Sequence, residues 1–510
     1  MTNLLTSPLI QTDAGWFSLP SLLAAMAQGK VQSFPAMRPH QRPAWHMFLV
    51  QLAVLALNGA GLKDIPEDAE AWAAALRGLT PDFQDDCPWF LIGEDRSKPA
   101  FLQPAETGGG NWSRVRTPDA LDMVITARNH DLKAEVAAVS APQDWVFALV
   151  SLQTMEGFGG RGNYGIARMN GGSSSRAMIS LAPVVPGSSQ IDPSKWWRRD
   201  VKCLLTVRDS LSGIALIWLH PWPDNQSLSW ERLDDLCVEV CRRVRLVEDG
   251  GIVALKCPST APRIDAKALK GNTGDPWAPI EVTEAKSFTL GDRDWTARDL
   301  NTLMFEGAAW KRPRLAEPFD GEDTSAMAIV AEAFSRGNSK TDGFKSRVVP
   351  VPKAVVKVAF GSSVREVCDG ILADIASIEG ALKFGLRLYS SEGDKAKLDS
   401  TMKSASARGR LDSSFGNYLA SYRDAADQAF FPEMWVRLAA KPHPALEIAR
   451  RKFVDLLTTY AKAEFELALD SLPCATLMRP RARVRAEAAF YGSLHKIKEG
   501  WAKEETSHDA

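Results

Sequence analysis

In the first 350 residues, apolar residues occur in short runs broken by Gly, Pro and Trp. After that they recur at the three- and four-residue steps of a helix. The opening "LLTSPLIQT" followed by "GWFSLPSLLAAMAQ" predicts a strand, a turn and a helix whose N-cap lies near Ser18. "AMISLAPVV", "VKCLLTVRDS" and "GIALIWLHPW" have the composition of strands or buried segments. "SWERLDDLCVEVCRRVRLVEDGGIVALKC" predicts a helix, a Gly-Gly turn and a strand. Helices and strands that interleave without a βαβ rhythm indicate an α+β fold.

The segments become long and helical after "VVPVPKAV" at 348–355. One apolar stripe at steps of three and four residues is formed by Val364, Val367, Ile371, Ile378 and Leu382. Further amphipathic helices are expected at about 411–430, from "HPALE" at 443 to about 467, and at about 482–501. We therefore predict a large, irregular mixed α/β domain over residues 1–355 and a four-helix bundle over residues 356–510.

The most apolar run, "WHMFLVQLAVLALNGAGL", raises the question of a membrane span. It is short, it follows a basic, proline-rich segment and it contains Gln51, so a buried helix is the better interpretation. The N-terminus has polar breaks and no basic region of the kind that begins a signal peptide. We therefore expect a cytoplasmic protein that does not use a membrane.

Composition and charge narrow the class of protein. The chain has 510 residues, of which 45% are hydrophobic and 24% charged, with a formal net charge of −1. This is ordinary globular composition, so any nucleic-acid surface must be a local patch. The seven cysteines include one close pair, Cys237 and Cys241, which would lie one turn apart on the predicted helix. No CxxC motif occurs, and we expect reduced thiols and no zinc.

A search for catalytic motifs finds none. The seven histidines do not form HxH, HExxH or any pair at i and i+4. "NHD" at 129–131 resembles part of a metal-dependent nuclease site, but the further His and Asp ligands that such a site needs are absent from the sequence pattern. No GxSxG, Walker loop or Cys/His signature appears either. The sequence therefore predicts a binding protein, without catalytic residues, metal or cofactor.

The stretch "GFGGRGNYG" matches Gly157-x-Gly159-x-x-Gly162. A dinucleotide loop needs a strand directly before these glycines and a helix directly after them. "DWVFALVSLQTME" before the loop fits either a strand or a short helix, and the serine- and glycine-rich segment after it is not an amphipathic helix. Two interpretations are favoured, a structural turn or a loop shaped for close contact with a large partner. The alternative is a nucleotide-binding enzyme that uses the Gly157–Gly162 loop.

Basic residues gather in several short segments. "CRRVRL" would place Arg242, Arg243 and Arg245 at a helix end, where the dipole favours cations. "RPRARVR" at 479–485 suits either a solvated turn or a contact with phosphate or protein. "RNHDLK" and "SRGNSKTDGFKSR" mix cations with Asn and Gly, as loops that approach the minor groove or the DNA backbone do.

Taken in order, these landmarks resemble those of one family. The chain is similar to the large, CasA-type subunit of Cascade, the type I-E CRISPR surveillance complex. The resemblance rests on "NLLTSPLIQT…SLPSLL", "RPAWHMFLVQLAVLAL", "GFGG" at 157–160, "EVCRRVRL" at 239–246 and "GNSKTDGFKSRVVPVP" at 337–352, followed by the helical C-terminal region. It therefore covers nearly the whole chain.

The resemblance implies a non-catalytic, DNA-recognition subunit of an RNA-guided antiviral complex. Such a subunit recognises the protospacer-adjacent motif in target double-stranded DNA and helps to open the duplex for R-loop formation. It also docks the helicase–nuclease that degrades the target. Its partners would be target DNA, the crRNA-bound backbone and small subunits of Cascade, and the recruited helicase–nuclease.

The resemblance also implies candidate DNA-binding residues. The glycine loop, Gly157, Phe158, Gly159 and Gly160, would approach the motif from the minor groove, where the absence of Cβ atoms admits the backbone. A first recognition loop would use Asn129 and Lys133, and the lysine that reaches the minor groove would be Lys267 or Lys270, both of which remain candidates. In the wedge loop, Asn338 stands where the family often has glutamine, with Lys340 beside it.

Overall fold

The computed structural model divides the chain into two compact units, each of which is described by itself. The first comprises Met1–Trp295 and Thr302–Lys353, and the second comprises Thr296–Asn301 and Ala354–Ala510. The structure describes residues 2–122, 140–171, 174–305, 307–337, 340–356, 358, 360, 364–440 and 443–508, with the backbone alone for residues 336–337, 340–342, 443 and 500–508.

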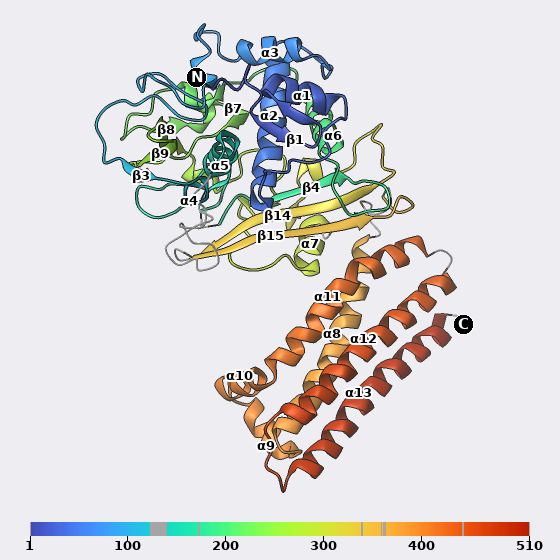
Figure 1. Ribbon diagram of the computed structural model, residues 1–510. Coiled ribbons are helices and arrows are strands. Elements are labelled where there is room, and N and C mark those ends of the chain that lie inside the picture. Colours follow the sequence, from blue (N-terminus) through green and yellow to red (C-terminus); the bar gives the residue numbers. More distant parts are fainter. Residues whose placement is uncertain are drawn as a thin grey trace. The chain divides into compact units, whose positions relative to one another are not determined.

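The elements follow one another along the chain as Figure 1 shows. The helices are α1 (Leu19–Ala27), α2 (Arg42–Gly59), α3 (Ala69–Gly78), α4 (Pro118–Leu121), α5 (Pro142–Met155), α6 (Pro193–Leu205), α7 (Ala297–Met304), α8 (Val364–Ser390), α9 (Lys395–Met402), α10 (Ala405–Ser414), α11 (Gly416–Ala439), α12 (His443–Ser471) and α13 (Arg479–His508). The strands are β1 (Ile10–Thr12), β2 (Gly15–Phe17), β3 (Ser113–Val115), β4 (Met178–Pro183), β5 (Ile214–Leu216), β6 (Leu228–Ser229), β7 (Leu233–Val238), β8 (Arg243–Glu248), β9 (Ile252–Cys257), β10 (Ile264–Asp265), β11 (Ile280–Glu281), β12 (Lys286–Ser287), β13 (Trp310–Lys311), β14 (Met327–Gly337) and β15 (Lys340–Val351).

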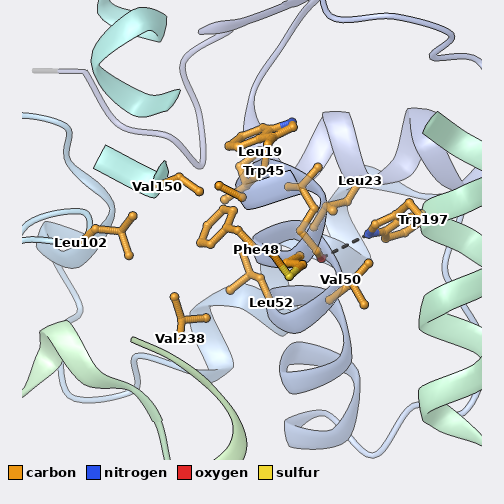
Figure 2. Close-up of a cluster of buried hydrophobic side chains, with 14 of the residues drawn as sticks. Leu19, Leu23, Trp45, Phe48, Val50, Leu52, Leu102, Val150, Trp197 and Val238 are labelled. Atoms are coloured by element: carbon orange, nitrogen blue, oxygen red, sulfur yellow. Dashed lines mark hydrogen bonds between the residues drawn. The ribbon is translucent and has the colours of Figure 1, made fainter. Parts of the chain in front are cut away.

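The first unit is built around α2, which is buried along nearly its whole length. Figure 2 shows Trp45, Phe48 and Leu52 of this helix among apolar side chains from α1, α5, α6 and β7. Trp197 of α6 donates its indole N–H to the carbonyl of Leu49 at 3.2 Å. A helix that is apolar on all sides must be surrounded by protein or by lipid, and here protein surrounds it. None of the helices described by the structure is long and apolar enough to cross a membrane.

The predicted N-terminal elements are confirmed. The β1–β2 hairpin leads directly into α1, and the Ser18 side chain caps this helix by accepting a hydrogen bond from the Ser21 amide. The segment "AMISLAPVV" forms β4, which pairs antiparallel with β14. The central strand β14 pairs on its other edge with β15, so this sheet has the order β15-β14-β4.

"VKCLLTVRDS", predicted as a strand or a buried segment, begins in the buried C-terminal part of α6 and is therefore the second of these. One prediction for the middle of the first unit is wrong. The segment predicted as a helix before the Gly-Gly turn is two strands, β7 and β8, and β8 then turns at Gly250 and Gly251 into β9. Cys237 is therefore at the end of a strand and does not share a helix turn with Cys241. Both faces of β7 and β8 are largely buried, which removes the alternation that would have indicated strands.

The second unit contains the predicted four-helix bundle. Its long helices are α8, α11, α12 and α13, and the two short helices α9 and α10 connect α8 to α11. The buried carboxylate of Asp374 on α8 accepts hydrogen bonds from Arg437 of α11 at 2.9 Å and Arg450 of α12 at 3.0 Å. Tyr389 of α8 donates its hydroxyl hydrogen to the carbonyl of Leu469 on α12 at 2.8 Å. These polar contacts connect α8 to α11 and α12 in the interior of the bundle.

Candidate nucleic-acid interface

The glycine loop begins where α5 ends and is closed at its base. Glu156 forms an antiparallel bridge with Ser175, and the Gly157 amide donates to the carbonyl of Ser174 at 3.1 Å. A helix therefore precedes the glycines, and no helix follows them in residues 161–171 or 174–192. A dinucleotide site needs a strand before the glycines and a helix after them. The Gly157–Gly162 loop is therefore not a dinucleotide-binding loop of the strand–glycine–helix kind.

Inside the loop, hydrogen bonds hold a tight turn. The Gly159 amide donates to the carbonyl of Asn163 at 2.8 Å, and the Asn163 amide donates to the carbonyl of Gly160 at 2.9 Å. Gly160 has a φ of +106°, a conformation that side chains disfavour, and the space beside it is open. Phe158 and Gly159 are exposed, whereas Gly157 is buried. The loop thus presents an aromatic ring and bare backbone to solvent on a buried base.

The two candidate lysines flank one short turn. Lys267 begins a 3-10 turn that ends at Leu269, and Lys270 follows it in the left-handed conformation with a φ of +48°. Both side chains are exposed, and neither forms a salt bridge to a residue that the structure describes. Lys286 lowers the pKa of Glu284 through a hydrogen bond, and Lys270 adds a smaller electrostatic contribution in the same direction. The exposed ammonium groups are therefore available to a phosphate or to a groove.

The lysine turn packs on the segment that follows the glycine loop. A Cβ atom at Gly271 would lie 2.8 Å from the backbone nitrogen of Asn170 and 2.8 Å from the carbonyl carbon of Met169. In addition, the Ser287 amide donates to the carbonyl of Lys270 at 3.0 Å, and the Ser287 hydroxyl donates to the carbonyl of Arg168 at 3.4 Å. Only glycine permits this close approach of the two backbones. The lysine turn is therefore packed on residues 168–170, which follow the glycine loop in the sequence.

The β14–β15 hairpin is fastened to the base of the same loop. The Ser175 amide donates to the carbonyl of Phe334 at 3.1 Å, and the Phe334 amide donates to the Ser175 hydroxyl at 2.6 Å. Phe334 lies on β14, a few residues before the hairpin turn. Asn338 is outside the described residues, and Lys340 begins β15 with its side chain outside them.

The predicted first recognition loop, with Asn129 and Lys133, falls within residues 123–139, outside the described part of the chain. Its N-terminal flank is placed. The Asp122 carboxylate is hydrogen-bonded to His40 and to Gln41, each at 2.8 Å, and the His40 ring lies 5.1 Å from the ring of Phe334. The N-terminal flank of the predicted loop, at Asp122, is therefore connected through His40 to β14, the first strand of the β14–β15 hairpin.

Three buried arginines brace these segments. The Arg176 guanidinium binds the Asp275 carboxylate, with Nε and Oδ2 at 2.6 Å, and so ties the base of the glycine loop to the chain just after the lysine turn. Arg168 binds Glu239 at 2.6 Å, and Arg242 donates from Nη2 to the carbonyl of Gly157 at 2.8 Å. Each guanidinium is almost completely buried. These buried contacts thus fix the base of the glycine loop against distant parts of the first unit.

The interpretation of "CRRVRL" as cations at a helix end is wrong. Arg243 and Arg245 lie on β8, Arg242 directly precedes it, and all three are buried. Arg245 donates to the carbonyls of Lys98 at 3.0 Å and Gln103 at 3.3 Å, and burial lowers its pKa to about 10. These bracing roles were not predicted from the sequence. The available signal was an arginine inside an apolar run, which can be buried only with a partner.

The basic segment "RPRARVR" also has internal partners. Arg483 forms salt bridges with Glu466, Asp470 and Glu487 at 2.9–3.0 Å. Arg485 donates to the carbonyl of Gly393 at 2.8 Å. These contacts engage Arg483 and Arg485 within the second unit, and the Arg485 bond supports the turn between α8 and α9.

The residues described here contain no group of three or more His, Cys, Asp or Glu side chains that could hold a metal ion. The seven cysteines are free thiols, and six of them are buried. Burial raises the pKa of Cys237 to about 12, which keeps this thiol protonated at neutral pH. The arrangement offers backbone, an aromatic ring and cations to a partner.

No family model and no curated protein matches the chain in sequence. Solved structures do match. CasA (Cse1) of Thermus thermophilus is 15% identical with a TM-score of 0.65, and the match covers 97% of this chain and 99% of that one. The CRISPR-associated protein Cse1 of Acidimicrobium ferrooxidans is 16% identical with a TM-score of 0.63, covering 98% of each chain. Cse1 of Thermobifida fusca is 13% identical with a TM-score of 0.52, covering 96% of this chain and 98% of that one. Over nearly its whole length, the chain has the fold of the CasA (Cse1) proteins.

Proposed function

We propose that this protein is the DNA-recognition subunit of an RNA-guided, Cascade-type complex. It recognises a protospacer-adjacent motif in double-stranded DNA, helps to open the duplex for R-loop formation and docks a helicase–nuclease. It has no nuclease activity of its own and works in the cytoplasm with a crRNA-bound backbone and small subunits. The fold of CasA (Cse1) chains supports the assignment to such a complex.

The observation that carries the DNA-recognition proposal is the convergence of three segments that lie far apart in the sequence. The glycine loop closes at Ser174 and Ser175, the hairpin strand β14 is bonded to Ser175 through Phe334, and the lysine turn packs on Met169 and Asn170. Glycine backbone enters a minor groove without steric conflict, and lysines neutralise phosphates at its edges. We therefore propose Gly157, Phe158, Gly159, Gly160, Lys267 and Lys270 as DNA contacts.

The glycine loop provides the direct test of this function, at Gly159. This residue is exposed and has no positive φ, and an added Cβ would lie 3.4 Å from the Asn163 Cβ, an ordinary contact. Gly159→Ala should therefore change the free energy of unfolding by no more than about 0.5 kcal/mol. The methyl group should nevertheless hold the backbone away from the groove. We expect the preference for motif over non-motif duplex to fall about tenfold, the equivalent of about 1.4 kcal/mol.

The measurement is duplex binding by the assembled complex, after the motif has been identified by selection from randomised duplexes. Gly109→Ala is the matched control, because Gly109 is also exposed, has no positive φ and has open space beside it. Gly160→Ala is not suitable, since its φ of +106° should cost about 1–3 kcal/mol of stability. A Gly159→Ala complex that melts normally and still discriminates would exclude the loop from motif recognition.

We also propose that Asn338 acts as the wedge, that Lys340 supports it, and that Asn129 and Lys133 form a first recognition loop. Asn338→Ala should slow R-loop formation on relaxed DNA more than it weakens initial binding, because a wedge acts only once a base pair has separated. Unstacking one base step costs on the order of a few kcal/mol. Negative supercoiling should restore part of the rate, since it supplies opening energy. If the mutant opens relaxed DNA at the wild-type rate, Asn338 is not the wedge.

A further inference from the structure

The second unit carries basic side chains at the end where α8 turns into α9. Arg481 of α13 donates to the carbonyl of Glu392 at 3.0 Å and lies 4.0 Å from the Asp394 carboxylate, while Arg485 donates to the carbonyl of Gly393 at 2.8 Å. The first turns of α13 therefore lie against this turn, and α9 and α10 follow it directly in the chain (Figure 1). Carbonyl groups carry no net charge, so these hydrogen bonds do not neutralise the two guanidinium groups.

The helix α10 is attached to α8 by ion pairs rather than by a buried apolar face. None of its residues is buried. Its Asp412 carboxylate accepts two hydrogen bonds from Arg387 of α8, at 2.8 and 2.7 Å, and lies 3.2 Å from the ammonium group of Lys383. Two cations thus share one carboxylate, so this contact also leaves positive charge at the surface.

The cations of α9, of α10 and of the junction between them are exposed. Four of them form no salt bridge and no side-chain hydrogen bond with a residue that the structure describes: Lys395, Lys403, Arg408 and Arg410. The carboxylate of Asp399 is also exposed. Positive charge therefore predominates on residues 395–414, the α9–α10 surface, although the whole chain has a net charge of −1.

The α9–α10 surface lacks the side chains that other classes of partner need. Between residues 385 and 435, all of which the structure describes, no large hydrophobic side chain is among the exposed ones. Protein interfaces have an apolar or aromatic centre, and single-stranded nucleic acid stacks its bases on aromatic side chains. Neither feature is available on the α9–α10 surface.

The exposed positions of α10 are small or basic instead. Ser406, Gly409, Arg410 and Ser413 follow the spacing of one helix face, and all four are exposed. Arginine, lysine and serine side chains are common contacts of phosphate oxygens, which position a protein on DNA without reading its sequence. A duplex presents its phosphates about twice as densely along its axis as one strand does. The chemistry of this surface therefore fits the backbone of a duplex.

We propose that the α9–α10 surface binds the phosphate backbone of double-stranded DNA without regard to base sequence. This contact goes beyond the recognition of a motif, which is proposed for the first unit, and it requires no motif in the DNA. It adds the same affinity for target and non-target duplexes, because phosphates are identical in both.

The test is binding of the full-length protein to a duplex of about 30 base pairs that lacks the selected motif, followed by fluorescence anisotropy at several salt concentrations. Arg408→Gln with Arg410→Gln should reduce the affinity about tenfold near 100 mM salt and lower the slope of log K against log salt by about two. The melting temperature should not change, since neither side chain has a partner among the described residues.

Lys452→Gln with Lys496→Gln is the matched control. It removes the same charge from two exposed side chains of the second unit that also have no partner among the described residues. Lys452 lies in the first half of α12 and Lys496 in the second half of α13, away from the turn between α8 and α9. The control should lower the affinity less than about twofold, through the long-range field.

A charge-preserving variant separates charge from side-chain geometry. Arg408→Lys with Arg410→Lys should bind the duplex as the wild type does, because a backbone contact of this kind depends on charge. If it binds as weakly as the glutamine variant, the arginines recognise a planar acceptor such as a protein carboxylate, which contradicts the proposal.

Two further results would overturn the proposal. One is an equal affinity and salt slope for the glutamine variant and the lysine control. The other is a greater loss of affinity for an oligo(dT) strand of the same length than for the duplex, which would identify the partner as single-stranded. Motif discrimination by the assembled complex should be unchanged in all these variants, so this test and that of the proposed function can fail independently.

Discussion

Replacing Arg176 with Met should destabilise the first unit by about 3–5 kcal/mol, because it leaves the Asp275 carboxylate buried without its partner. Both side chains of this pair are almost completely inaccessible, and the guanidinium also lies 5.3 Å from the ring centre of Trp277. The pair ties the base of the glycine loop to the chain after the lysine turn. DNA discrimination should therefore fall together with stability.

Urea unfolding followed by tryptophan fluorescence measures this loss, since only Trp435 and Trp501 of the sixteen tryptophans lie in the second unit. Arg114→Met is the matched control. It breaks the exposed Arg114–Asp249 pair and should cost no more than about 1 kcal/mol. The double variant Arg176→Met with Asp275→Leu should recover much of the stability, because no unpaired charge remains. Equal losses in the test and control variants would contradict the bracing role of Arg176.

Replacing Lys267 and Lys270 together with Ala should weaken binding to motif-containing duplex by about 1–3 kcal/mol for each lysine that contacts DNA. The slope of log K against log salt should also decrease by about one for each phosphate contact that is lost. Both side chains are exposed and form no salt bridge to a described residue, so complex assembly and melting should be unchanged. Alanine retains a Cβ at the positive φ of residue 270 and adds no new backbone strain.

Lys30→Ala with Lys63→Ala is the matched control, since it removes two exposed lysines from the same unit and changes the net charge equally. The control should reduce affinity only slightly, through the long-range field. The two single variants then show whether Lys267 or Lys270 makes the groove contact. If the double variant and the control have the same affinity and salt slope, these lysines are not at the interface.

The sequence was sufficient where local rules decide the structure. The Ser18 cap, the apolar run of α2 and the helical spacing in the second unit are properties of neighbouring residues, and the structure confirms the elements they predict. The connecting pair α9 and α10 was not predicted. No residue of α10 is buried, so this helix has no apolar stripe that a sequence pattern would reveal.

The strands β7 and β8 show where local rules were insufficient. Val240 and Val244 are four residues apart, a spacing that also suits one face of a helix. Arg243 and Arg245 appear polar in the sequence, but in the structure both are buried on β8. The alternation Arg-Val-Arg-Leu at 243–246 covers only four residues, and the helical spacing of Leu233 and Leu236 before it favoured the helix.

The same distinction between local patterns and tertiary contacts applies to the candidate interface. The residue types were evident from the sequence, since glycines allow close backbone approach and lysines suit phosphates. Their convergence depends on contacts between distant residues, such as Ser175 with Phe334 and Arg176 with Asp275. A local pattern shows that a buried charge or amide needs a partner, but it does not identify which distant residue supplies it. The sequence therefore determined the chemistry of each loop, and tertiary packing alone decided which distant segments contact one another.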